Sequence, residues 1–108
     1  MTTIAASVED RLRLAKDAAR EVGLLDAADK ASLLEAIADA IEAATDAIVA
    51  ANDYDLQRGR AAGIGDALLD RLRLDAGRVA ALSEAVRDVA QLPDPVGRVL
   101  DRRTLANG

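Results

Sequence analysis

The chain of 108 residues is long enough for one domain, and its 51% hydrophobic and 31% charged residues are typical of a globular protein rather than a disordered one. A net charge of -5 argues against nucleic-acid binding, which relies on clustered Lys and Arg. Cysteine and histidine are both absent, which excludes disulfides, a thiol nucleophile and the commonest general base and zinc ligands.

The first predicted helix begins after Ser7, a good N-cap residue, with Asp10 in the position of a capping box. Gly23 ends it. One face of this helix is apolar, because hydrophobic residues recur at helical spacing: Val8, Leu12, Ala15, Ala19 and Val22.

The second predicted helix is the longest, running from Asp26 to a break at Asn52. Apolar residues recur along it in steps of three and four at Leu34, Ile37, Ile41, Ala44 and Ile48. An acidic stripe lies about 150° away at about 100° per residue, formed by Glu35, Asp39, Glu42 and Asp46. Such a stripe could hold a weakly bound cation, but a solvated helix face is the favoured interpretation.

Three further helices are predicted. A short one covers residues 53–62 and is closed by Gly63, and another runs from Gly65 to Leu72. Asp75 caps a last long helix that ends at Leu92, before Pro93. Its apolar positions, which match the stripe of the second helix, are Val79, Leu82, Val86 and Val89. The sequence therefore predicts a mainly α fold, with residues 1–92 forming a helical bundle. Aromatic residues are only 1% and alanine is abundant, so this core should be weak without a partner.

Residues 93–108 read as the start of a β-hairpin. Pro93 and Pro95 stop the last helix, strand-like residues follow from Val96 to Leu105, and Asn107-Gly108 is a strong signal for a two-residue hairpin turn. No returning strand follows, so we expect one C-terminal strand from a hairpin that is cut short.

Residue types that could carry chemistry are few, and none forms a recognisable site. Asp53 and Asp55 fail as a calcium loop, because the glycine and the final glutamate that such a loop needs are missing. Gly59, Gly63 and Gly65 follow a helix instead of a strand, and we interpret them as turns rather than a phosphate cradle.

Tyr54 is expected to be a packed ring with its hydroxyl bonded to backbone. The remaining polar candidates are interpreted as caps or surface residues: Ser7, Ser32, Ser83, Lys30 and the group Arg98, Arg102 and Arg103. The sequence thus predicts no catalytic, cofactor-binding or metal-binding residue. Met1 to Ser7 lacks the pattern of a signal peptide and no apolar run is long enough to span a bilayer, so a cytoplasmic location without membrane contact is the default expectation.

Three segments carry a family resemblance: IVAANDYDL at residues 48–56, RAAGIGDALLDRL at 60–72 and LPDPVG at 92–97. Together they resemble the N-terminal quarter of glutamate-5-semialdehyde dehydrogenase, also called gamma-glutamyl phosphate reductase. Gly65 stands where that family often has a serine cap, and Arg102-Arg103 replaces a segment that is commonly less charged.

The resemblance implies a parent protein with the α/β fold of the aldehyde dehydrogenase superfamily. It further implies an NADPH-dependent reduction of L-glutamyl 5-phosphate to L-glutamate 5-semialdehyde in proline biosynthesis, through a catalytic cysteine. That cysteine lies further along the chain in the family, so the resemblance assigns no catalytic or NADPH-binding residue to these positions. It makes this chain an inactive leading piece whose partner is the remainder of the enzyme.

A second hypothesis is an autonomous helical module that binds other proteins through its apolar stripes. A cooperative, well-behaved monomer would favour this module, whereas self-association or weak unfolding would favour a fragment. We expect the isolated chain to associate with itself, because its apolar faces and strand edge are otherwise uncovered.

Overall fold

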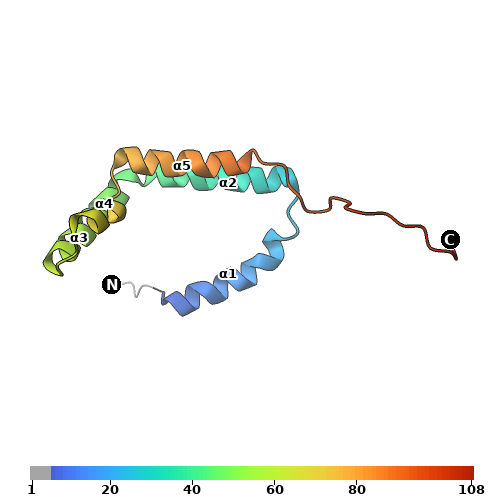
Figure 1. The fold of residues 1–108 in the computed structure, drawn as a ribbon, viewed down its shortest axis with the longest axis horizontal. Coiled ribbons are helices and arrows are strands. Elements are labelled where there is room, and N and C mark those ends of the chain that lie inside the picture. The colour runs from blue at the N-terminus through green and yellow to red at the C-terminus, as the bar shows by residue number, and fades with distance from the viewer. Residues whose placement is uncertain (1–5) are drawn as a thin grey trace.

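The computed structural model describes residues 6–108 as a chain of helices (Figure 1). Residues 1–5, part of the stretch considered for a signal peptide, lie outside the described residues. In chain order the helices are α1 (Val8–Val22), α2 (Ala27–Ala43), α3 (Thr45–Ala61), α4 (Asp66–Leu72) and α5 (Ala76–Ala90). None of the helices in the described part is long and apolar enough to cross a membrane.

The predicted helix starts at Ser7, Asp26 and Asp75 are confirmed, and each is fixed by a side-chain cap. Ser7 Oγ accepts from the backbone N–H of Asp10, whose carboxylate in turn accepts from the backbone N–H of Ser7. Asp26 and Asp75 likewise accept from the backbone N–H three residues on, each at 2.8 Å. Each cap satisfies an N–H that the first turn of a helix leaves without a partner.

The prediction of one helix from Asp26 to Asn52 is wrong. The break falls at Ala44, where φ and ψ of -93° and 8° leave the helical range, and α3 runs on through Asn52. The Thr45 hydroxyl donates to the Glu42 carbonyl oxygen at 2.6 Å, and such back-bonding from a β-branched residue bends helices. The apolar periodicity continues across this bend, which is why the sequence pattern does not reveal it.

The antiparallel pair α2 and α5 forms the main packed layer (Figure 1). Ala38 of α2 and Val79 and Ser83 of α5 are fully buried between them. Ser83 Oγ donates to the Ala38 carbonyl oxygen at 3.2 Å, so Ser83 is a core residue rather than the cap or surface residue predicted. The small side chains let the two helices approach closely but bury little area.

A second contact joins α3 and α4. Gly59, in the last turn of α3, is buried against Leu69 of α4, and a Cβ there would lie 3.0 Å from Leu69 Cδ2. Gly59 is therefore a close-packing residue, and its interpretation as a turn is wrong. Gly63, with φ of +80°, does end the helix as predicted, because glycine adopts positive φ without a steric cost.

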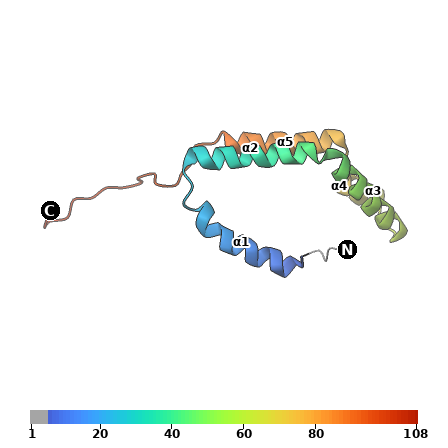
Figure 2. The same ribbon diagram turned by 180° about the vertical axis from the view of Figure 1, so that it is seen from behind.

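Helix α1 lies apart from the other helices in both views (Figures 1 and 2). It buries none of its own residues against the described part of the chain. The Cα radius of gyration is 20.4 Å, whereas a compact domain of this length has about 13 Å. The prediction of a mainly α chain is thus confirmed, but α1 is not part of the packed helices in the described residues.

The C-terminal strand expected in residues 93–108 is wrong, because residues 98–105 are extended but pair with no other strand among the described residues. A β-strand requires backbone hydrogen bonds to a neighbouring strand, whereas the backbone hydrogen bonds of this segment join residues three apart in turns. One turn joins Arg98 N–H to the Pro95 carbonyl at 3.2 Å, with Gly97 at φ of +85°. A second joins Gly108 N–H to the Leu105 carbonyl at 3.0 Å, so its central pair is Ala106-Asn107, one residue before the pair predicted.

Candidate functional site

One of the two buried polar side chains among the described residues is Asn52, which ties α3 to the connection between α4 and α5. Its Nδ2 donates to the Leu72 carbonyl oxygen at 2.8 Å, and its Oδ1 accepts from the Leu74 N–H at 2.7 Å. The Asn52 side chain is buried, and both ends of its amide are satisfied. The sequence does hold a signal for this role, because Asn52 follows Ile48 by four residues and so lies on the apolar stripe. A polar residue on that stripe is buried and needs hydrogen-bond partners within the protein.

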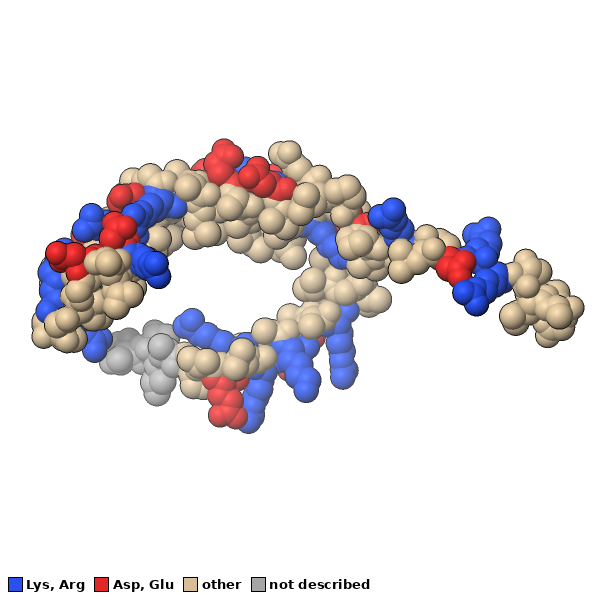
Figure 3. Space-filling view, viewed as in Figure 1, with Lys and Arg blue, Asp and Glu red and all other residues tan. Residues whose placement is uncertain are grey.

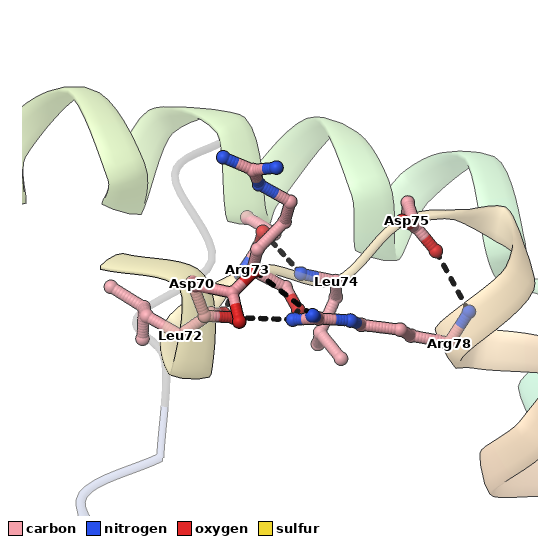
Figure 4. Close-up of polar contacts among 7 residues, drawn as sticks. Asp70, Leu72, Arg73, Leu74, Asp75 and Arg78 are labelled. Carbon is pink, nitrogen blue, oxygen red and sulfur yellow. Dashed lines mark hydrogen bonds and ion pairs between the residues drawn. The ribbon is translucent and has the colours of Figure 1, made fainter. Parts of the chain in front are cut away.

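The same connection is held from its other side by Arg78 of α5 (Figure 4). Arg78 donates to the carbonyl oxygens of Asp70 and Arg73 and pairs with the Asp70 carboxylate at 3.0 Å. Figure 4 shows its side chain lying along the turn, between the end of α4 and the start of α5. The residues around this turn are therefore engaged in holding the backbone, which is a structural role.

Three residues of the predicted acidic stripe lie on α2, and the fourth, Asp46, lies in α3. The prediction that the stripe is a solvated face is wrong for the α2 residues, because Arg87 of α5 lies against them. The guanidinium contacts three of the four carboxylates, at 3.4 Å for Glu35, 2.9 Å for Asp39 and 2.6 Å for Glu42. The hydrogen bond from Arg87 lowers the pKa of Glu42, and the same contacts raise the pKa of Arg87. The cation on this stripe is thus a protein side chain. In the described residues no group of His, Cys, Asp or Glu could hold a metal ion.

A small groove of about 230 Å³ lies where the end of α5 meets the start of α2. Across it Lys30 Nζ pairs with Asp94 Oδ2 at 2.9 Å, and the Asp94 carboxylate also accepts from the Val96 N–H at 3.0 Å. Both contacts, that with Lys30 first, lower the pKa of Asp94. Lys30 and Asp94 are half-buried, so the prediction that Lys30 is a surface residue is wrong.

The other sequence candidates are dispersed. Tyr54 is 61% exposed with the Arg58 guanidinium 5.8 Å from its ring, so the prediction of a packed ring is wrong. Asp53 and Asp55 lie within α3 and Ser32 is exposed on α2. Arg103 pairs with Asp101 at 2.9 Å, as predicted for that basic group.

The three glycines offer no fit to the phosphates of NADPH. Gly59 is packed inside a helix, Gly63 ends that helix, and Gly65 begins the seven-residue α4 without a preceding strand. A dinucleotide site needs a tight turn from strand to helix whose N–H groups face the ligand. We therefore derive no cofactor chemistry from these residues.

The amino-acid sequence of the chain is similar to those of several gamma-glutamyl phosphate reductases. A gamma-glutamyl phosphate reductase from Kineococcus radiotolerans is 56% identical over 107 residues, which is 99% of this chain and 25% of that protein. The protein of the same name from Xanthomonas axonopodis pv. citri is 50% identical over 86% of this chain and 22% of its own length. That from Thermobifida fusca is 42% identical over the whole chain and 26% of its own length. The chain is thus similar to gamma-glutamyl phosphate reductases over nearly all of its own length.

The chain spans about a quarter of the length of the reductases it matches. No family model matches it, and no solved structure matches it. The segments that carry the resemblance to the reductases meet in the structure. Asn52 of the first segment bonds to Leu72 at the end of the second, and Asp94 of the third holds α2 through Lys30. The segments that carry the resemblance therefore also supply contacts that hold the helices together.

Proposed function

We propose that these residues are the N-terminal, non-catalytic part of an NADPH-dependent enzyme that reduces L-glutamyl 5-phosphate to L-glutamate 5-semialdehyde in proline biosynthesis. The observation that carries the proposal is the identity of 42–56% to gamma-glutamyl phosphate reductases over nearly the whole chain. The remainder of the enzyme, with an aldehyde dehydrogenase-like α/β fold, would supply the cofactor and the cysteine. The proposal also places the enzyme in the cytoplasm.

Two features of the chain support a structural role for this part. It has no cysteine, so it lacks the nucleophile that the family's chemistry uses. Its buried polar side chains, Asn52 and Ser83, are each bonded to backbone. Both side chains are buried, and their hydrogen bonds join separate helices, which is a structural role.

The test compares the 108-residue chain with a longer product of the same gene that includes a cysteine. We expect the longer protein to oxidise NADPH with glutamyl phosphate, or to form NADPH from the semialdehyde, phosphate and NADP+. The 108-residue chain alone should do neither. A longer protein without both activities would refute the proposal, as would turnover by the 108 residues alone.

The second candidate, a helical interaction module, is favoured by one observation: α1 exposes its whole apolar face. Binding of the 108-residue chain to an unrelated protein through that face, together with an inactive longer product, would support this alternative.

A further inference from the structure

The C-terminal segment, residues 93–108, leaves the helices at the corner where the end of α5 meets the start of α2 (Figures 1 and 3). Beyond this corner Figure 3 shows the segment running away from the helices, with charged side chains along it. No hydrogen bond or ion pair joins residues 98–105 to a helix in the described part of the chain. The direction of the segment is therefore set by the few residues at the corner.

One ion pair joins the segment to α2 at this corner. Lys30 lies near the start of α2, and its Nζ is 2.9 Å from Oδ2 of Asp94, which lies 64 residues further along the chain. The two side chains are only 26% and 17% exposed. The pair of Arg103 with Asp101, within the segment, is 84% and 64% exposed and joins residues two apart. Of the two pairs, only that of Lys30 with Asp94 holds the segment against a helix.

The surroundings of the Lys30–Asp94 pair make it costly to break. The groove around it is lined mainly by apolar residues of both helices, among them Ala31 and Leu34 of α2 and Val89 of α5. Such walls exclude part of the water that would otherwise surround the two charges, so salt weakens this pair less than an exposed one. Removing one partner also leaves the other charge half-buried without compensation. The pair is therefore a firmer connection than an exposed ion pair would be.

The second oxygen of Asp94 connects the pair to the backbone that follows. Asp94 Oδ1 accepts from the Val96 N–H at 3.0 Å, which closes a turn between the side chain and the backbone. Pro93 and Pro95, on either side of Asp94, each have a fixed φ. The hydrogen-bonded turn at residues 95–98 follows directly. The backbone between the pair and the extended residues thus has little freedom.

We propose that the Lys30–Asp94 pair fixes the direction in which the chain leaves the helices, and that the turn at residues 95–98 passes this direction on to the segment beyond it. Without the pair, only the end of α5 would join the segment to the helices, and the segment would sample many directions. Under the function proposed above, Lys30 and Asp94 would be positioning residues that place the remainder of the enzyme relative to α2 and α5. The proposal itself does not depend on the reductase activity and is tested in the 108-residue chain, so failure of one leaves the other standing.

The experiment measures the direction of the segment with pairs of spin labels, by pulsed electron paramagnetic resonance. The chain has no cysteine, so introduced thiols are the only sites that react with the label. Ala36→Cys on α2 and Val99→Cys just after the turn, both at exposed positions, form the reporting pair. Ala36→Cys with Ala81→Cys, at an exposed position of α5, forms the reference pair within the packed helices. In the original chain the reporting pair should give a single distance peak as narrow as that of the reference pair.

Two variants remove one charge each from the Lys30–Asp94 pair. They are Lys30→Gln and Asp94→Asn, and the second keeps a side-chain oxygen that can accept from the Val96 N–H. Either change should broaden the reporting distribution by on the order of 10 Å, the spread of a flexible stretch of about five residues, and leave the reference distribution unchanged. Asp101→Asn is the matched control, because it removes a carboxylate from the exposed pair in the same segment, and it should change neither distribution.

A broad reporting distribution in the original chain would overturn the proposal. So would equal broadening by Asp94→Asn and Asp101→Asn, or no broadening by Lys30→Gln. A reference distribution that broadens with Lys30→Gln would also overturn it, because the pair would then hold the helices together instead of directing the segment.

Discussion

Helices α1 and α5 are both 15 residues long and both begin at a capping side chain, yet only one of them is packed. α5 buries Val79 and Ser83 against α2, whereas no residue of α1 is buried by the described part of the chain. α1 has the more sharply separated apolar face, since its stripe is unbroken from Val8 to Val22. The difference shows that local sequence signals suffice to place a helix, while its packing depends on whether a complementary surface lies within reach. Four substitutions, each with a control variant, test this difference between the packed helices and α1.

The largest effect is expected for Asn52→Ala. The change leaves the Leu72 carbonyl and the Leu74 N–H without their buried partner, which should lower the free energy of unfolding by about 2–3 kcal/mol. Urea unfolding followed by circular dichroism measures this loss. Asp53→Ala, at the exposed neighbouring position, should stay within about 0.5 kcal/mol of the original chain. Equal stability of the two variants would show that Asn52 does not organise the packed region.

Gly59→Ala should have the next largest effect. Alanine is favoured over glycine in a helix by about 1 kcal/mol, but its Cβ would lie 3.0 Å from Leu69 Cδ2 in a buried contact. Overpacking costs about 1–3 kcal/mol, so we expect a net loss of about 1 kcal/mol. Gly77→Ala in α5 is the matched control, because its Cβ would meet only Asp75 Oδ1 at 3.4 Å, and it should stabilise by about 0.5 kcal/mol. A gain at both positions would contradict close packing between α3 and α4.

The sequence predicts the parts of this fold that depend on local chemistry. The caps at Ser7, Asp26 and Asp75 and the end of α3 before Gly63 follow from residue type alone. The bend at Ala44 is not visible, because the apolar spacing continues through it and only the Thr45 hydroxyl marks it.

The contacts that join distant helices are equally hidden from the sequence. Arg87 reaches Glu42 across 45 residues, and Ser83 reaches Ala38 across the same separation, so each depends on the way α2 and α5 pack. The strand expected in residues 98–105 also depends on a contact with a distant segment, and here that contact does not form. Its residue types favour extended backbone, but a strand exists only with a partner, and none of the described residues supplies one.

The third prediction concerns pH and the ion pairs between packed elements. Arg87 lowers the pKa of Glu42 and Lys30 that of Asp94, so both carboxylates bind protons less readily when folded than when unfolded. Their contribution to stability is therefore present above their unfolded pKa values of about 4 and is lost as pH falls through the lowered folded values. The melting temperature should fall on acidification below about pH 4.5.

Arg87→Gln removes the cause of the shift in Glu42, and should lower the melting temperature at pH 7 while flattening its decline in acid. Thermal melts at a series of pH values measure both effects. Arg98→Gln changes an exposed arginine outside the helices, and should leave the profile unchanged. Parallel profiles for Arg87→Gln and the original chain would show that the cluster does not stabilise the α2–α5 pair.

The smallest effect on global unfolding is expected for Ser7→Ala. Loss of the cap should destabilise α1 by about 1 kcal/mol, because the N–H of Asp10 loses its acceptor. α1 buries none of its residues against the described part of the chain, so this loss reduces helix content without moving the urea midpoint of the other helices. Asp75→Ala removes the corresponding cap of the packed α5, so it should lower the free energy of unfolding by about 1 kcal/mol and lower that midpoint accordingly. A midpoint shifted equally by both variants would mean that α1 unfolds together with α5, and would remove the distinction between the two helices.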